Sequence, residues 1–332
     1  MRPLVALALA LSLAAGPAVG RERLSGRIAC AGGDTMAALM QRWGEAVHAR
    51  HPAVTVTVDP KAKLAAEGFG SLIAGQADCV TFVREPFPSE QAAFQARFGH
   101  APLLVPVARG SFATRGGTHA IAVYVNAANP IAGLTLAQLD AAFSATPRRG
   151  AAKPAMTWGD LGLAGAWADR PVRVYGMLAH RASGDPPGVV NFLQRRVLLG
   201  APLRADVAEQ VDRPGEQALA AIVRKVAQDP DGLGYSGFGY AAAGARAVPI
   251  AETAQGPYVA GSPQSLADGR YPLSRRIYIM VDRTPGRPLP AALNAFLRYA
   301  LSPGGQAALA ADAEGFMPLT PAEAADARKL LQ

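Results

Sequence analysis

Strand-like and helix-like segments alternate along the first third of this chain, and no other feature limits its fold as strongly. Short β-branched or apolar runs, which favour strands, lie at residues 27–30, 54–58 and 79–83. Between the first two runs, apolar residues recur at three- and four-residue steps over 36–47, as on one face of a helix. A shorter helical stretch ends near Gly75. This order of elements predicts a parallel sheet with helices on its faces.

The alternation continues to the end of the chain. Further strands are expected at 119–126, 171–175 and 277–281, and further helices at 136–143, 189–197 and 289–301. With 332 residues, of which 50% are hydrophobic, the chain is too long for one small domain and fits two packed lobes. The predicted fold class is α/β, with a mostly parallel sheet flanked by helices in each lobe.

Residues 1–20 have the layout of a secretory signal peptide. Arg2 precedes an uncharged apolar run over 4–15, and small residues, Ala18 and Gly20, lie three and one positions before a cleavage point. The run is too short for a permanent membrane span, and no Cys at the cleavage point suggests a lipid anchor. We therefore expect an exported, periplasmic protein that is not a lipoprotein.

Composition argues against several classes of function. Two Cys residues, Cys30 and Cys79, are too few for a multi-cysteine metal site, so no metal is expected. In an oxidising compartment they could form a disulfide, but two separate buried thiols fit their strand-like surroundings equally well. The formal charge of +8 favours anionic partners. Because the basic residues are scattered, nucleic acid is not expected to be one of them.

Two glycine-containing turns each follow a predicted strand and precede a predicted helix. They consist of Gly33, Asp34, Thr35 and Met36, and of Ser183, Gly184 and Asp185 with Arg181 just before them. The start of a helix has free amide groups and partial positive charge, and hydroxyl and guanidinium groups add donors for an oxyanion. Helix capping alone would explain either turn. Two such turns, one in each half, favour an anion bound between the lobes.

A third candidate is Arg84, which follows the strand at 79–83, because open α/β sheets bind ligands at the carboxyl ends of their strands. The alternative is a solvated ion pair with Glu85.

Enzyme motifs are incomplete. The stretch around Ser236 resembles a nucleophile elbow but has Phe238 in place of the last glycine, and no His and acid are placed by a motif to assist Ser183 or Ser236.

Short stretches along almost the whole chain after residue 20 carry a family likeness in their order and spacing. They are AGGDTM at 31–36, GQAD at 75–78, REP at 84–86, NAANP at 126–130, TWGDL at 157–161, GLGY at 232–235 and YPLSR at 271–275. In these stretches the chain resembles the periplasmic phosphate-binding proteins of bacterial ABC transporters, in the type II periplasmic binding protein superfamily. The resemblance implies two lobes joined by crossing strands, with phosphate bound unchanged between them.

By the same resemblance, residues 21–118 plus 250–332 form lobe 1 and residues 119–249 form lobe 2. The implied ligand loops contain Thr35 and Met36, Gly70 and Ser71, the Arg84 region, and Arg181, Ser183 and Gly184. The chain departs from the family pattern at three places: Ala179 and Asp185 stand where Arg and Thr are usual, and Arg84 falls where Asp is common.

The predicted function is an exported solute-binding protein that captures inorganic phosphate and delivers it to an inner-membrane ABC permease. We expect a monomer without catalysis, cofactor or metal. An aspartate in one of the two turns, Asp34 or Asp185, is expected to accept the proton of hydrogen phosphate, which sulfate lacks. The alternatives are another small oxyanion, a sensor or adhesion role on the same fold, and a phosphatase or esterase that uses Ser183 or Ser236.

Overall fold

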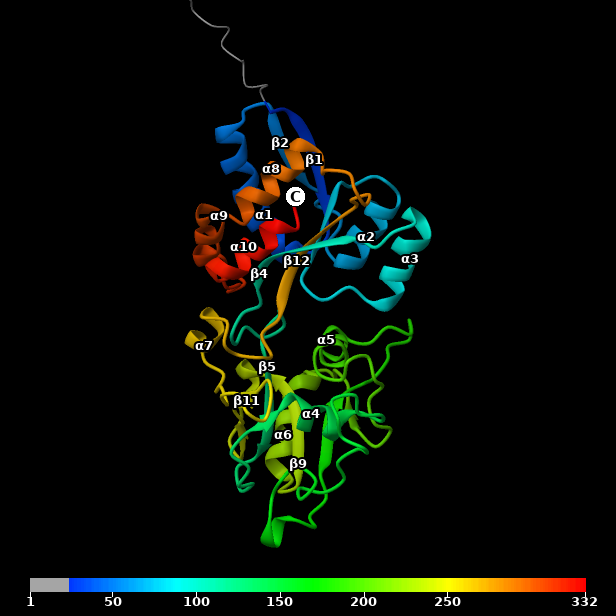
Figure 1. Ribbon diagram of the computed structural model, residues 1–332, viewed down its shortest axis with the longest axis vertical. Coiled ribbons are helices and arrows are strands. Elements are labelled where there is room, and N and C mark those ends of the chain that lie inside the picture. Colours follow the sequence, from blue (N-terminus) through cyan, green and yellow to red (C-terminus); the bar gives the residue numbers. More distant parts are fainter. Residues whose placement is uncertain (1–23) are drawn as a thin grey trace, which may run out of the picture.

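The computed structural model describes residues 24–332, so the signal peptide predicted at 1–20 lies outside the described residues. Two five-stranded sheets form the centres of two lobes, one above the other in Figure 1. The upper lobe contains β1 (Gly26–Ala31), α1 (Asp34–Arg50), β2 (Val54–Val58), α2 (Ala65–Ile73), β3 (Cys79–Phe82), α3 (Pro88–Phe98), β4 (Leu103–Arg109), β12 (Arg276–Val281), α8 (Ala291–Ala300), α9 (Pro303–Ala307), η3 (Ala308–Ala311) and α10 (Pro321–Lys329).

The lower lobe is built from the middle of the chain. Its elements are β5 (Ile121–Asn126), β6 (Leu134–Thr135), α4 (Leu136–Phe143), η1 (Gly165–Trp167), β7 (Arg173–Met177), α5 (Gly188–Arg196), β8 (Ala208–Gln210), α6 (Ala218–Gln228), β9 (Gly232–Gly237), η2 (Phe238–Tyr240), β10 (Ala245–Ala247), β11 (Ile250–Ala251) and α7 (Pro263–Ala267). The two strands β6 and β11 form a small separate sheet.

Each five-stranded sheet has one antiparallel strand among parallel ones. The upper order is β2-β1-β3-β12-β4, in which β12 runs antiparallel to both neighbours. The lower order is β10-β5-β9-β7-β8, in which β5 runs antiparallel to both neighbours. These two strands directly follow the segments that cross between the lobes, so each enters its sheet from the opposite end. The predicted α/β class with two mostly parallel sheets is confirmed.

Apolar helix faces cover both sheets. On α1, the predicted spacing places Met36, Leu39 and Trp43 in the core of the upper lobe, fully buried. The indole N–H of Trp43 donates to the Gly305 carbonyl at 2.8 Å, which joins α1 to α9 without leaving a buried donor unpaired. In the lower lobe, α6 packs against one face of the sheet through residues that include Ile222 and Val226.

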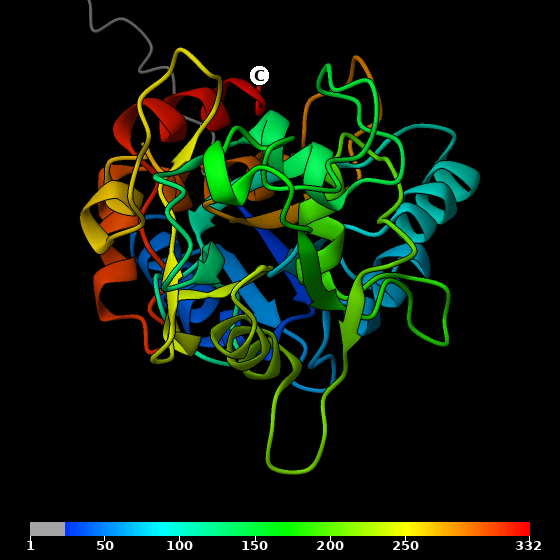
Figure 2. The ribbon, with the colours of Figure 1, turned by 90° about the horizontal axis from the view of Figure 1, so that it is seen from below.

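Two chain segments cross between the lobes side by side. Residues 110–120 lead from β4 to β5, and residues 268–275 lead from α7 back to β12 (Figures 1 and 2). The amide of Gly110 donates to the Arg275 carbonyl at 3.1 Å, and the amide of Ile121 donates to the Leu273 carbonyl at 3.0 Å. Hinges between lobes consist of a few loop residues or residues at the ends of elements, and both crossing segments supply such residues.

The division of the chain between the lobes stays a prediction, and packing supports a refinement of it. Strand β11 pairs with β6, and Leu266 and Leu273 belong to the apolar core of the lower lobe. We therefore propose that residues 250–273 go with lobe 2 rather than lobe 1. The physical reason is that this stretch buries its apolar side chains against the lower sheet before the chain returns to β12.

Candidate functional site

A cavity of about 570 Å³ lies where the two lobes meet, and we call it the interlobe cleft. The upper lobe contributes the start of α1, the loop before α2 and the loop after β3. The lower lobe contributes the loop after β7 and the start of α5, and both crossing segments complete the wall. The cleft thus gathers strand ends and helix starts from both lobes, as ligand sites of open α/β sheets do.

Helix α1 begins at the cleft, and Gly33 makes this possible. Gly33 has a φ of 62°, and a Cβ there would lie 2.9 Å from the Thr81 hydroxyl oxygen, so a larger residue would be both strained and crowded. The amide of Asp34 donates to the Lys63 carbonyl at 3.0 Å, and the amide of Thr35 donates to the Asp34 carboxylate at 2.8 Å. The Thr35 hydroxyl oxygen is buried and has no hydrogen-bond partner within residues 24–332.

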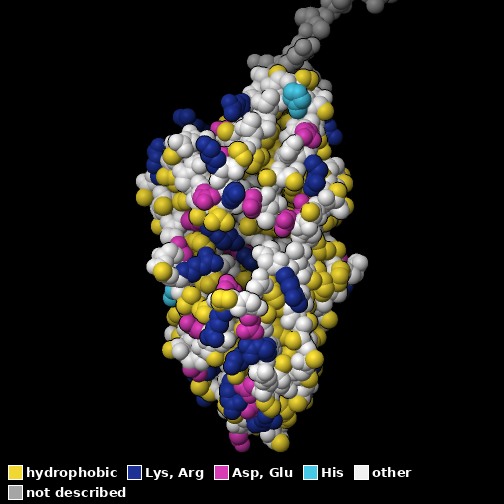
Figure 3. Space-filling model, turned by 180° about the vertical axis from the view of Figure 1, so that it is seen from behind, with side chains coloured by type: hydrophobic (Ala, Val, Ile, Leu, Met, Phe, Trp, Pro, Cys, Tyr) yellow, Lys and Arg dark blue, Asp and Glu magenta, His cyan; other side chains and the backbone are white. Residues whose placement is uncertain are grey.

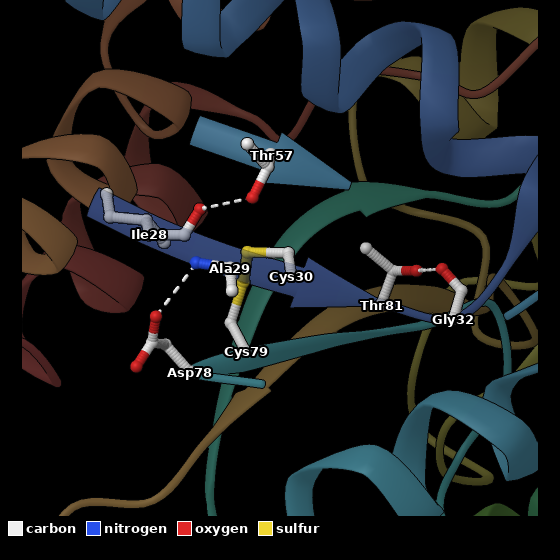
Figure 4. Close-up of a disulfide and its surroundings, with 8 residues drawn as sticks. All are labelled: Ile28, Ala29, Cys30, Gly32, Thr57, Asp78, Cys79 and Thr81. Atoms are coloured by element: carbon white, nitrogen blue, oxygen red, sulfur yellow. Dashed lines mark hydrogen bonds between the residues drawn. A yellow bond between two sulfur atoms is a disulfide. The ribbon is translucent and has the colours of Figure 1, made fainter. Parts of the chain in front are cut away.

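A disulfide holds together the two strands that lead into the upper half of the cleft. Cys30 on β1 and Cys79 on β3 face each other in the sheet and are bonded (Figure 4). Near the cleft, the Thr81 hydroxyl donates to the Gly32 carbonyl. On the side of the disulfide away from the cleft, the Ala29 amide donates to the Asp78 carboxylate at 2.8 Å. The loops that follow β1 and β3 therefore keep a fixed spacing.

Four cationic side chains line the cleft: Lys63, Arg84, Arg181 and Arg275. Arg84 is held by Glu90 through bonds of 2.6 and 2.8 Å, and its guanidinium carbon lies 3.6 Å from the centre of the Phe87 ring. Arg275 donates to Glu85 at 2.9 Å. Among the described residues, Lys63 and Arg181 have no carboxylate within ion-pair distance. One free cation from each lobe therefore faces the cleft.

Three carboxylates also line the cleft: Asp34, Asp212 and Glu314. Because Arg84 and Arg275 are paired with Glu90 and Glu85, the positive charge available to a ligand is that of Lys63 and Arg181. His119 does not add to it at neutral pH, because burial and, more weakly, the charge of Arg275 lower its pKa, although its bond to the Ala120 carbonyl acts in the other direction. A cation from each lobe suits a small anion that brings its own hydrogen-bond acceptors.

The structure brings five of the predicted site residues into the cleft: Gly33, Asp34, Thr35, Arg84 and Arg181. It places three others elsewhere. Met36 is fully buried in the core of the upper lobe. Gly70 and Ser71 lie on α2, and Ser71 lines a separate small cavity beside Cys30. The apolar face of α1 explains the position of Met36, because a residue one step beyond Thr35 turns into the core.

The second predicted turn lies just outside the cleft lining. Ser183 and Gly184 are exposed, and the Asp185 carboxylate accepts a 2.7 Å hydrogen bond from Ser89 on α3. Helix α5 begins only at Gly188. The prolines at 186–187 account for this delay, since they lack amide donors and hold the residue before them in an extended conformation.

Sequence reasoning missed three cleft residues of note: Lys63, Thr118 and Arg275. Lys63 precedes α2 in a loop without a glycine motif. Thr118 follows a pair of glycines, and its hydroxyl donates to the Val83 carbonyl, which joins the crossing segment to the β3 end. Arg275 ends the YPLSR stretch, which carries part of the family likeness, so the sequence does contain a pattern from which this cleft residue could have been predicted.

Ser236, the other nucleophile that the sequence raised, is fully buried in β9. Its hydroxyl donates to the Leu219 carbonyl at 2.8 Å, so it joins β9 to α6.

None of the helices in the part of the chain from 24 onward has the length and apolar character to cross a membrane.

Comparison with known proteins identifies the family to which this chain belongs. A model described as a PBP superfamily domain matches residues 17–303. The phosphate-binding protein PstS of Pseudomonas aeruginosa is 34% identical over 303 residues, which is 91% of this chain and 86% of the relative. Protein SphX of Synechococcus elongatus is 27% identical over 209 residues, which is 62% of this chain and 55% of that relative.

Solved structures agree on the fold. An ABC-type phosphate transport receptor from Vibrio cholerae has a TM-score of 0.51 and 16% identity, and covers 88% of this chain and 100% of its own. PstS from Borrelia burgdorferi has a TM-score of 0.51 and 13% identity, and covers 88% of this chain and 98% of its own. With its two sheets, its paired crossing segments and its 34% identical relative, the chain belongs to the PBP superfamily and, within it, to the family of the phosphate-binding protein PstS.

Proposed function

We propose that this protein captures inorganic phosphate in the interlobe cleft and delivers it to the permease of an ABC transporter. The observation that carries the proposal is a pair of cations on opposite lobes of the cleft, Lys63 and Arg181. Like the Thr35 hydroxyl at the start of α1, they have no partner among residues 24–332. A tetrahedral oxyanion supplies acceptors for all of these donors at once. The relatives that are named for phosphate support the same ligand.

Binding is coupled to a hinge motion in this proposal. A ligand that touches both lobes favours the conformation in which they approach each other. Thr35 and Lys63 would hold the anion from the upper lobe, and Arg181 would hold it from the lower lobe. Ser183, Gly184 and Asp185, which lie outside the cleft lining here, would approach the ligand as the lobes close.

Selectivity for phosphate over sulfate is proposed to depend on a carboxylate. Hydrogen phosphate has a proton to donate, whereas sulfate at neutral pH has none. A carboxylate in the site therefore accepts a hydrogen bond from the first and repels the second. Asp34 is the better placed of the two candidates, because it lines the cleft and its carboxylate lies at the start of α1.

We also propose that the protein acts by binding alone, as an exported monomer. The geometry around the candidate serines supports this: Ser236 is buried and bonded to a backbone carbonyl, and Ser183 lies in an exposed loop where its hydroxyl contacts the Asp185 amide at 3.4 Å. Release of ligand to a membrane permease needs the lobes to reopen, which the paired crossing segments allow.

Calorimetry with phosphate, arsenate, sulfate and tungstate tests this function. Phosphate should bind at one tight site, and Arg181→Gln should weaken that binding, because it removes the free cation of the lower lobe. The control is Arg298→Gln on α8, where the guanidinium bonds Asn294 far from the cleft. Tight binding of sulfate or tungstate in preference to phosphate would reassign the ligand. An unchanged affinity in Arg181→Gln would show that the cleft is not the site.

A further inference from the structure

A second cavity, of about 380 Å³, lies beside the crossing segments and shares no lining residue with the interlobe cleft. Five arginines line it: Arg109, Arg195, Arg196, Arg270 and Arg276. We call it the arginine cavity. It is bounded by the end of α5 in the lower lobe, by the start of β12 in the upper lobe and by the crossing segment at 269–274. Figure 3 shows Lys and Arg side chains around the waist of the molecule.

Within residues 24–332, these five arginines share three carboxylates. Glu323 accepts from both Arg109 and Arg276. Arg196 pairs with Glu252, and Arg270 pairs with Asp268.

Arg195 has no carboxylate within ion-pair distance in the described chain, and the only hydrogen bond that its side chain makes there is a 3.5 Å contact with the Pro86 carbonyl. The one other carboxylate in the lining, Glu85, is bound to Arg275. The arginine cavity therefore has an excess of positive charge that the protein itself does not neutralise.

Three donors around this cavity have unmade hydrogen bonds. The Nε of Arg109, the Nη1 of Arg276 and the hydroxyl of Ser274 are buried and have no partner within residues 24–332. Arg109 is fully buried, and burial lowers its pKa although Glu323 opposes the shift. Leaving such donors unpaired is costly, and guanidinium groups match the geometry of tetrahedral oxyanions.

We propose that the arginine cavity is a second binding site, for a small multivalent oxyanion of the phosphate or pyrophosphate class. Arg195 and Arg196 stand on the lower lobe and Arg276 on the upper lobe, so a bound anion contacts both. The same helix, α5, has its start at the interlobe cleft, where Gly188 lies, and its end at the arginine cavity.

Equilibrium dialysis with radiolabelled inorganic phosphate tests the proposal on the full protein. Wild type should bind two phosphates per chain, the second more weakly and with stronger dependence on ionic strength. Arg195→Gln should weaken the second site about tenfold, as expected for one lost charge-assisted contact, and leave the first unchanged. This variant is suitable because Arg195 is unpaired, so its loss leaves no carboxylate without a partner.

Two further variants separate this proposal from the proposed function. Arg181→Gln should weaken the first site and spare the second, and Arg298→Gln should change neither. Binding of one phosphate per chain up to millimolar concentrations would overturn the second site. An Arg195→Gln protein that still binds two phosphates with unchanged constants would overturn it as well.

Pyrophosphate should compete for the second site and bind it more tightly than phosphate does, because it offers more charge to the same arginines. A poly-glutamate peptide is the remaining arm of the experiment. If it binds in an Arg195-dependent manner while neither phosphate nor pyrophosphate displaces it, the cavity belongs to an acidic protein segment and the proposal is wrong.

Discussion

Thr35→Val should separate the requirements of ligand binding from those of folding. The substitution replaces the hydroxyl by a methyl group of similar shape. This hydroxyl oxygen is buried and has no hydrogen-bond partner in residues 24–332, so it contributes no hydrogen bond to the stability of the fold. A hydrogen bond to a charged ligand is worth about 1.5–3 kcal/mol, which corresponds to a loss of about 10- to 150-fold in phosphate affinity. The melting temperature should stay unchanged or rise slightly, because a buried unpaired polar group is lost.

Calorimetry and thermal unfolding should be measured on the same samples, with Thr57→Val as the matched control. The Thr57 hydroxyl on β2 donates to the Ile28 carbonyl at 3.3 Å, and Thr57 does not line the interlobe cleft. Its substitution should lower stability by about 1 kcal/mol and leave phosphate affinity unchanged. The reasoning fails if Thr35→Val binds phosphate as wild type does, or if it loses as much stability as the control.

Three further predictions concern other parts of the molecule. Replacing Cys30 and Cys79 by serine should lower the free energy of unfolding by about 4 kcal/mol, given a loop of 49 residues, and an unchanged guanidinium midpoint would contradict this. Asp34→Asn should reduce the preference for phosphate over sulfate more than Asp185→Asn does; if neither changes the ratio of the two dissociation constants, the carboxylate hypothesis is wrong. Burial acts to raise the pKa of Glu323, but a backbone amide and two arginines together lower it, so its contribution to stability is present above pH 4.5 and lost as the pH falls through the depressed value. The melting temperature of Glu323→Gln should therefore fall less steeply on acidification than that of wild type. An equally steep fall would show that the Glu323 carboxylate does not stabilise the fold above pH 4.5.

The order of strands and helices was predictable because it depends on local patterns. The apolar spacing over 36–47 lies within α1, and the β-branched run at 54–58 coincides with β2. The direction of β5 and β12 was not predictable in this way. Residue spacing reports which face of a strand is buried, but it does not report from which end the chain enters the sheet. That direction follows from the two crossings between lobes, which are tertiary features.

The candidate site was predictable only where a motif marks it. Gly33 and Thr35 were found because a glycine turn joins a strand to a helix. Arg84 was found as a charge at a strand end, but its commitment to Glu90, six residues later, depends on how the β3–α3 loop folds back. Lys63 reaches the cleft only because its own carbonyl accepts the amide of Asp34, a contact between segments almost thirty residues apart. No local pattern contains that information.

The two halves of the cleft differ in how firmly they are held, and this difference indicates what moves. In the upper half, the disulfide and the Thr81 hydrogen bond fix the strand ends before any ligand arrives. In the lower half, the start of α5 is already docked on the upper lobe, because the Asn191 side chain donates to the Glu85 carbonyl at 2.9 Å.

Arg195, at the other end of α5, also contacts the upper lobe, because its guanidinium lies 3.5 Å from the Pro86 carbonyl oxygen. Within the described chain, the loop over 180–185 makes one side-chain hydrogen bond to the upper lobe, that of Asp185 with Ser89. Closure on a ligand is therefore expected to be a rotation about the crossing segments and the docked end of α5, which carries Arg181 and the exposed loop toward Thr35.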